Sequence, residues 1–175
     1  MILTYQVALV TGAGSANGIG FACASALAAD GATVVLTSTT ERVHDRVAEL
    51  RALGRQAEGV VCDLMVDGAA QLLVDLAAAV GGRLDICVNN AGLIAVGGNA
   101  TDASLENTTD DLWRDGIERN LTTCFAVTRA AVRQMRPRGY GRIVNIASTS
   151  GPVQAFTGDV AYHAAKAGML GFTRA

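Results

Sequence analysis

The sequence predicts an α/β fold of the Rossmann type, with a doubly wound parallel sheet of about five strands in the order 3-2-1-4-5 and helices on both faces. Short runs rich in valine alternate with longer alanine-rich stretches along the 175 residues, the pattern of successive βαβ units. Half of the residues are hydrophobic and only 17% are charged, which suits strands buried on both faces. We therefore expect residues 1–175 to form one Rossmann-type domain.

Each expected strand is a short apolar run closed by glycines or polar residues. The first reads QVALVT and leads directly into a glycine-rich turn, and the last reads RIVNIA. These runs do not alternate polar with apolar residues, so both faces of the sheet should be covered. In chain order the strands are expected at residues 6–11, 32–38, 57–62, 84–89 and 142–147.

Each expected helix places apolar residues at helical spacing, and most of them are followed by residues that stop a helix. The stop residues are Gly31, Gly54, the pair Gly81-Gly82, and Pro137 with Gly139. A polar loop containing glycines is expected between residues 92 and 107. In chain order the helices are expected at residues 18–30, 41–53, 66–80, 109–135 and 160–175.

Charge and composition argue against several classes of function. The net charge is −2, so no basic surface supports nucleic-acid binding. No apolar stretch is long enough to span a membrane, and the N-terminus lacks the features of a signal peptide. The four cysteines form no Cys-x-x-Cys pair, so we expect reduced thiols, no metal site and a cytoplasmic protein.

The turn after the first strand has the composition and position of a pyrophosphate-binding turn. Glycines permit a tight turn and a close approach of the backbone to phosphate, and the next helix begins with free N–H groups. The spacing is Gly-x-x-x-Gly-x-Gly rather than Gly-x-Gly-x-x-Gly, so a purely structural turn is the alternative. The expected cofactor-binding residues of this turn are Gly12, Gly14, Ser15, Asn17, Gly18, Ile19 and Gly20.

The end of the second strand predicts a preference for NADP(H) over NAD(H). An acidic residue at this place binds the ribose 2′-hydroxyl of NAD and repels a 2′-phosphate. Here Ser38 is neutral, and Thr39 and Arg42 follow, so hydroxyl groups and a guanidinium are available to a phosphate. The alternative is that residues 38–40 only cap the next helix.

Tyr162 and Lys166 are four residues apart, so they face the same side of the expected last helix. A tyrosine phenol has a pKa of about 10, and a neighbouring cation stabilises the phenolate. Ser148 comes directly after the expected fifth strand. In open α/β sheets ligands bind at this end of the strands, which predicts a proton-transfer site.

In these features the chain resembles the classical short-chain dehydrogenase/reductase family, in particular 3-oxoacyl-acyl-carrier-protein reductases. The matching segments occur in the order of the family along the whole chain. They are the glycine turn through Gly20, Cys62-Asp63-Leu64, Asn89-Asn90-Ala91-Gly92, Asn120, Asn145-Ile146-Ala147-Ser148, and Tyr162 with Lys166. The resemblance implies transfer of hydride between a nicotinamide and a ketone or secondary alcohol.

The resemblance also implies a role for each catalytic residue. Tyr162 would donate or accept the proton, Lys166 would assist it and hold the nicotinamide ribose, and Ser148 would bind the substrate oxygen. Asn120 would hold a water that links Lys166 to solvent. The alternatives are that Asn120 only satisfies backbone groups and that Ser148 is only a turn residue; His163 is expected to have no catalytic role.

Further cofactor contacts follow from the same resemblance. Asp63, with Leu64 beside it, would contact the adenine, while Asn90, Ala91 and Gly92 would border the cofactor. A small-molecule carbonyl or alcohol is the expected substrate. The helices at 109–135 and 160–175 form the usual dimer face of the family, so a homodimer or homotetramer is expected.

Members of the family usually continue past the Tyr–Lys helix with two more strands and a segment that covers the substrate. The sequence ends at Ala175, before these elements. A truncated fragment without catalytic activity, which binds only dinucleotide or a partner, is therefore the alternative function.

Overall fold

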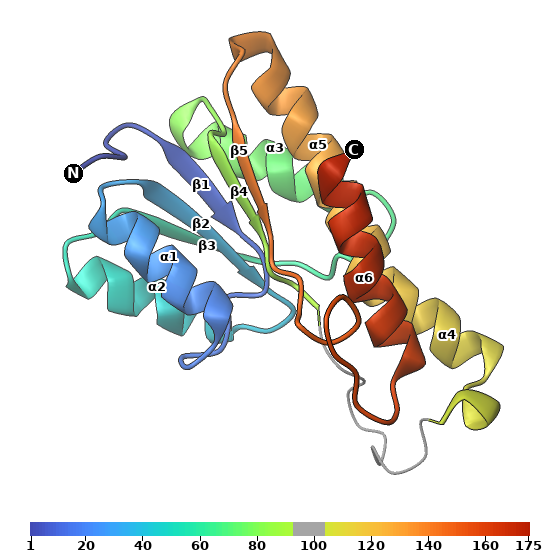
Figure 1. Cartoon of the computed structure of the whole chain (residues 1–175). Helices are drawn as coiled ribbons and strands as arrows, with labels where there is room; N and C mark the ends of the chain where they lie inside the picture. The colour runs from blue at the N-terminus through green and yellow to red at the C-terminus, as the bar shows by residue number, and fades with distance from the viewer. Residues whose placement is uncertain (93–103) are drawn as a thin grey trace.

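The computed structural model describes residues 1–92 and 104–175 and contains the expected parallel sheet. Its strand order is β3-β2-β1-β4-β5, with β1 at the centre (Figure 1). Leu9 of β1 lies between Val35 of β2 and Cys87 of β4. The strands are β1 (Val7–Val10), β2 (Thr33–Ser38), β3 (Ala57–Val61), β4 (Ile86–Asn89) and β5 (Arg142–Asn145).

The chain order of the strands reverses beside β1, because the chain passes outward to β3 and then returns to β4 on the other side. In such sheets the crevice beyond the carboxyl ends of the strands at the reversal is the usual ligand site. The glycine turn follows β1, and the segment after β4 lies next to it. The sheet order therefore places two predicted motifs at one crevice.

Six α-helices and three short helical segments connect and cover the described strands. The α-helices are α1 (Ile19–Ala29), α2 (Arg42–Ala52), α3 (Ala69–Gly81), α4 (Asp110–Ile117), α5 (Thr123–Met135) and α6 (Val160–Arg174). The short segments are η2 (Leu105–Asn107), η3 (Glu118–Thr122) and η4 (Arg136–Arg138). No helix in the described ranges has the length and hydropathy needed to cross a membrane.

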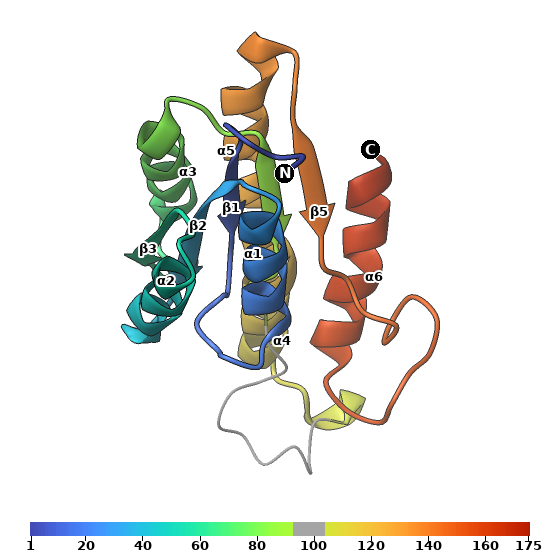
Figure 2. The same cartoon turned by 90° about the vertical axis from the view of Figure 1, so that its left-hand side faces the viewer.

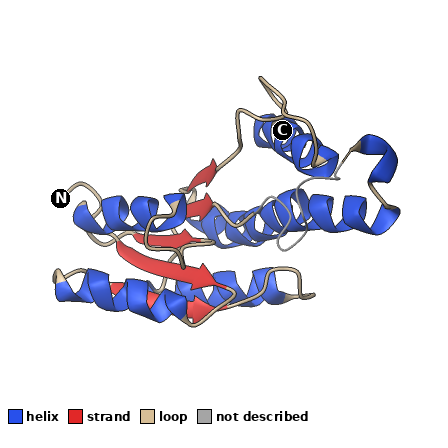
Figure 3. Ribbon diagram, turned by 90° about the horizontal axis from the view of Figure 1, so that it is seen from below, coloured by secondary structure: helices blue, strands red, loops and turns tan. Residues whose placement is uncertain are grey.

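Alternate residues of the strands face two separate hydrophobic cores. Ala8 and Val10 point toward α1 and α2, whereas Val7 and Leu9 point toward α3 and α5. Helices accordingly lie on both sides of the sheet when it is viewed from below (Figure 3). These opposed cores explain why the strands are continuous apolar runs in the sequence.

The helix expected at residues 66–80 begins later than predicted. Gly68 adopts a left-handed conformation with φ of +79°, and α3 starts at Ala69. Before it, the backbone N–H of Met65 donates to the carboxylate of Asp63 at 2.9 Å. This local turn competes with helix formation, so the helical spacing of the sequence extends beyond the actual helix.

The long helix expected at residues 109–135 contains a change of helical type. Thr109 caps the first turn, where its hydroxyl accepts a hydrogen bond from the N–H of Leu112 at 3.2 Å. Segment η3 is a π-helix between α4 and α5, and such segments often occur at functional sites. Most of the loop expected at 92–107 lies outside the described residues, which resume at Ser104 before η2.

Candidate active site and nucleotide-binding cavity

The glycine turn is packed too closely against β4 for larger residues. Gly12 has a φ of +68°, and a Cβ added there would lie 2.8 Å from the Cα of Ala91. A Cβ on Gly20 would lie 2.6 Å from Nδ2 of Asn90. Real Cβ atoms do not approach other atoms this closely, so the glycines are required by the path of the turn.

Asn90 and Thr11 hold this turn against the end of β4. Nδ2 of Asn90 donates to the carbonyl oxygens of Thr11 and Gly12, both at 3.0 Å. In return, the hydroxyl of Thr11 accepts from the backbone N–H groups of Asn90 and Ala91 at 3.0 and 2.9 Å. Asn90 therefore stabilises the glycine turn and also borders the cavity beyond it. The sequence indicated only the second of these roles.

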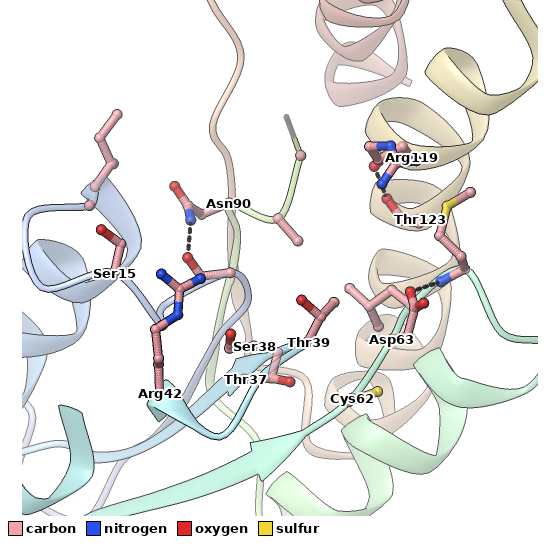
Figure 4. A pocket seen from close by; sticks show the side chains of 18 residues that line it. Ser15, Thr37, Ser38, Thr39, Arg42, Cys62, Asp63, Asn90, Arg119 and Thr123 are labelled. Carbon is pink, nitrogen blue, oxygen red and sulfur yellow. Dashed lines mark hydrogen bonds between the residues drawn. The ribbon is translucent and has the colours of Figure 1, made fainter. Parts of the chain in front are cut away.

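A cavity of about 360 Å³ opens beyond the glycine turn (Figure 4). Its volume lies within the range of roughly 300–1,000 Å³ that is usual for ligand sites. Thirteen of the predicted cofactor residues line it: Gly12, Gly14, Ser15, Gly18, Ile19, Ser38, Thr39, Arg42, Asp63, Leu64, Asn90, Ala91 and Gly92. The structure therefore brings together segments that follow β1, β2, β3 and β4.

Some predicted residues do not line the cavity, and some lining residues were not predicted. Asn17 is exposed, while Gly20 is buried behind the turn. Tyr162 and Lys166 do not line the cavity either. The lining residues that the sequence did not single out are Thr37, Cys62, Met65, Arg119 and Thr123. The last two are four residues apart in the chain, and this helical spacing is the signal that could have identified them.

The end of β2 presents hydroxyl groups and a guanidinium to the cavity. Nε of Arg42 donates to the hydroxyl of Thr40 at 3.1 Å, and the backbone N–H of Thr40 donates to the hydroxyl of Ser38 at 3.3 Å. The N-cap residue of α2 is Glu41, whose side chain makes no capping bond. Ser38 does not cap that helix, because its side chain faces Gly14, where an added Cβ would lie 2.8 Å from the serine Cβ.

Lys166 is buried on α6 beside the end of β5. Its side chain is 4% exposed, and its Nζ donates to the carbonyl oxygen of Ile146 at 2.9 Å. Burial lowers the pKa of the Lys166 ammonium, and the thiol of Cys124 opposes this effect. Nζ also lies 5.7 Å from the ring centroid of Tyr162. The predicted phenol and ammonium are therefore neighbours on one side of the helix.

Gly92 connects this pair to Asn120 and to the cavity. A Cβ added to Gly92 would lie 2.7 Å from Oδ1 of Asn120 and 3.5 Å from Nζ of Lys166. The same glycine lines the cavity. Asn120 is 1% exposed within η3, and its Nδ2 donates to the carbonyl oxygen of Gly116 at 3.0 Å. The amide nitrogen therefore satisfies a backbone group, while the amide oxygen faces Gly92. Asn120, Tyr162 and Lys166 thus form the candidate catalytic cluster.

Ser148 lies two residues beyond Ile146 in the loop after β5. Its hydroxyl accepts a hydrogen bond from the backbone N–H of Ser150 at 3.1 Å, as expected for a turn residue. The bond between Lys166 and Ile146 anchors the start of this loop to α6. Figure 2 shows β5 and α6 next to each other at one end of the sheet.

His163 fixes the other end of this loop, a role that the sequence did not reveal. The N–H of Phe156 donates to Nε2 of His163 at 3.2 Å, and Nδ1 lies 2.9 Å from the carbonyl oxygen of Asp159. Since the amide can only donate and the carbonyl can only accept, the imidazole proton is on Nδ1. Asp159 also accepts from the N–H of Tyr162 at 3.0 Å, so this loop sets the start of α6.

A network of amides and hydroxyls, partly buried at Asn89 and exposed at Thr173, connects β4 and β5 to α5 and α6. Nδ2 of Asn89 donates to Oδ1 of Asn145 and to the hydroxyl of Thr128, both at 2.8 Å. Nδ2 of Asn145 donates to the hydroxyl of Thr173 at 2.9 Å. These bonds support the position of α6 relative to the sheet.

Comparisons with known proteins agree with this architecture. The family model described as short chain dehydrogenase matches residues 6–175. A monensin polyketide synthase putative ketoacyl reductase of Streptomyces virginiae is 44% identical over 177 residues, which cover 98% of this chain and 64% of the relative. A 3-oxoacyl-(acyl-carrier-protein) reductase of Escherichia coli (strain K12) is 36% identical over 169 residues, 97% of this chain and 65% of the relative.

Two solved structures show the same similarity in three dimensions. A short chain dehydrogenase from Mycobacterium smegmatis superposes with a TM-score of 0.89 at 35% identity, covering 99% of this chain and 70% of that one. A metagenomic short-chain oxidoreductase in complex with NADP gives 0.88 at 35% identity, with coverage of 99% and 76%. The present chain therefore spans less than two thirds of the two curated relatives named above.

Proposed function

The chain belongs to the short-chain dehydrogenase family, and from this membership we propose that it is an NADP(H)-dependent reductase of 3-oxoacyl groups. The observation that carries the proposal is the position of Gly92. This residue borders both the nucleotide cavity and the cluster of Asn120 and Lys166. A dinucleotide that extends along the cavity would reach the catalytic residues at this point.

The residues of the cavity fit a dinucleotide. Gly12, Gly14 and Gly18 of the turn line the cavity, so the backbone N–H groups at the start of α1 would bind a pyrophosphate there. Arg42 and the hydroxyls of Ser38 and Thr39 would bind the 2′-phosphate, and Asp63 and Leu64 would border the adenine. A relative in structure is a complex with NADP, which supports this choice of cofactor.

The nicotinamide, when bound, supplies the hydride that reaches the carbonyl carbon of the substrate. The phenol of Tyr162 donates the proton to the carbonyl oxygen, so the ketone becomes a secondary alcohol. The ammonium of Lys166 stabilises the phenolate that forms. Ser148 holds the substrate oxygen, and Asn120 positions a water for return of the proton to Tyr162.

The named relatives favour a 3-oxoacyl substrate, because they are called ketoacyl and 3-oxoacyl reductases. The test is NADPH consumption by the purified chain with a 3-oxoacyl thioester. Turnover with NADPH is the expected result. Binding of NADPH without turnover would favour a non-catalytic dinucleotide-binding chain, and absence of NADPH binding would contradict both functions.

We also propose that the chain forms a homodimer or homotetramer through α4, α5 and α6. Leu112, Trp113, Phe125 and Val132 on α4 and α5 are exposed apolar side chains, and a partner subunit would cover them. The molar mass measured by light scattering should be two or four times the 18.0 kDa of one chain. A monomer at micromolar concentration would contradict this assembly.

A further inference from the structure

Arg119 lines the nucleotide cavity and is positively charged. None of the roles expected from the sequence belongs to this residue. Three charged residues line the cavity, namely Arg42, Asp63 and Arg119. Arg42 lies at the end of β2, where a 2′-phosphate is expected. Arg119 comes from η3, a different wall of the cavity. Within residues 1–92 and 104–175 no carboxylate forms an ion pair with its guanidinium.

The helical segment that carries Arg119 directs neighbouring residues to two different sites. Arg119 and Thr123 both line the cavity, and the hydroxyl of Thr123 donates to the carbonyl oxygen of Arg119 at 2.8 Å. Asn120 faces Gly92 and the catalytic cluster instead. Adjacent residues of a helical segment point in different directions. Segment η3 therefore places Arg119 in the wall of the cavity and Asn120 beside Gly92.

The position of Arg119 suits the base of the nucleotide better than its phosphates. Figure 4 shows Arg119 and Thr123 toward the same side of the view as Asp63, whereas Ser15 and Arg42 lie toward the other side. The glycine turn next to Ser15 is the expected pyrophosphate site, so the Asp63 side is left for the adenine. A guanidinium binds well over the face of an aromatic ring.

We propose that Arg119 binds the adenine base, with its guanidinium over the face of the ring and Asp63 at the ring edge. This proposal rests on the proposed dinucleotide function of the cavity. It makes Arg119 a contact common to NADPH and NADH, because both carry adenine. Arg42 is by contrast a contact for NADPH alone.

The test compares Arg119→Gln with the wild-type chain by calorimetric titration of NADPH, NADH, 5′-AMP and inorganic pyrophosphate. Glutamine removes the charge but keeps a long polar side chain. The expected result is binding roughly tenfold weaker for the three adenine ligands and unchanged for pyrophosphate. Arg133→Gln, an exposed position of α5 outside the cavity, should bind all four ligands as the wild-type chain does.

Two results would overturn the proposal while leaving the dinucleotide function intact. One is unchanged affinity of Arg119→Gln for 5′-AMP when the wild-type chain binds it. The other is weaker binding of pyrophosphate, which would make Arg119 a phosphate contact. If the wild-type chain binds no adenine ligand, the proposed function fails and the role of Arg119 fails with it. Unfolding curves of both variants check that the fold is retained.

Discussion

The ammonium of Lys166 donates a hydrogen bond of 2.9 Å to the carbonyl oxygen of Ile146, 20 residues earlier in the chain. This bond joins α6 to the end of β5 and directs the lysine toward both Tyr162 and Gly92. A buried ammonium requires such partners, because desolvation disfavours the charged form. Helix α6 is thus positioned by one of the residues expected to take part in the reaction.

Replacement of Tyr162 by phenylalanine should remove the proton donor and leave the fold intact. We expect kcat to fall by about 10²–10⁴-fold, with unchanged affinity for NADPH. Lys166→Met should lower kcat and also weaken NADPH binding, because it removes the bond to Ile146 as well as the charge. Steady-state rates and calorimetric titration separate the two effects. Tyr140→Phe is the matched control, because Tyr140 precedes the opposite end of β5 from Ile146 and Ser148. An equal fall in kcat in this variant would contradict the assignment of Tyr162.

Arg42→Ala should change the choice between the two cofactors. Loss of the guanidinium is expected to weaken NADPH binding by roughly 10–100-fold and to leave NADH binding nearly unchanged, because only NADPH carries the 2′-phosphate. Ser38→Asp should shift the preference further toward NADH. Arg55→Ala, outside the cavity, controls for general loss of positive charge. Equal weakening of both cofactors by Arg42→Ala would refute its role at the 2′-phosphate.

Gly92→Ala should disrupt the contact between the cavity and the catalytic cluster. The new Cβ would clash with Oδ1 of Asn120. In addition, the backbone φ of +151° at this position is one that residues with a side chain rarely adopt. We expect a loss of about 1–3 kcal/mol in unfolding free energy and at least a tenfold fall in kcat. Gly54→Ala is the control, because its φ is +71° but nothing lies within 4 Å of the added carbon. It should lose stability without losing turnover per folded molecule.

Alkaline pH should destabilise the fold through Cys87. Burial raises the pKa of this thiol to about 12, and Cys124 adds to the effect. An unfolded cysteine titrates near pH 8.5, so above that pH the unfolded chain loses a proton that the folded chain keeps. The free energy of unfolding should therefore fall by roughly 1.4 kcal/mol per pH unit for this group between these values.

Urea unfolding at several pH values would measure this dependence in the wild-type chain and in Cys87→Ala. In Cys87→Ala the free energy of unfolding should decline less steeply above pH 9 than in the wild-type chain. Val88→Ala, a neighbouring core substitution without a titrating group, should lower stability by a constant amount at every pH. A decline in Cys87→Ala as steep as that of the wild-type chain would exclude the thiol as its source.

Sequence patterns predicted the sheet and the cavity well because both depend on local chemistry. The apolar runs predicted the strands, their alternation with helices predicted the doubly wound order of the sheet, and the glycines predicted the turn after β1. Thirteen cofactor residues line the cavity because parallel strands bring their carboxyl ends to one edge. The late start of α3 was missed, since the competing turn at Asp63 uses a single side-chain bond that helical periodicity does not reveal.

Long-range contacts explain the other misses. Thr11 and Asn90 are far apart in the sequence, so their reciprocal hydrogen bonds follow only from the β1–β4 pairing. His163 was expected to have no catalytic role, and its task in holding Phe156 depends on the fold of the preceding loop. Arg119 enters the cavity through a π-helix, which the smooth periodicity of residues 109–135 gave no reason to expect.

The most direct measurement is isotope transfer from NADPH carrying deuterium at C4 of the nicotinamide to a 3-oxoacyl thioester. The proposed reaction predicts that the wild-type chain produces a 3-hydroxy product heavier by one deuterium at C3, from one of the two C4-deuterated isomers. Tyr162→Phe should bind the labelled cofactor and form almost no product. Bound cofactor with no deuterium in the product of the wild-type chain, for either isomer, would contradict the proposed hydride transfer.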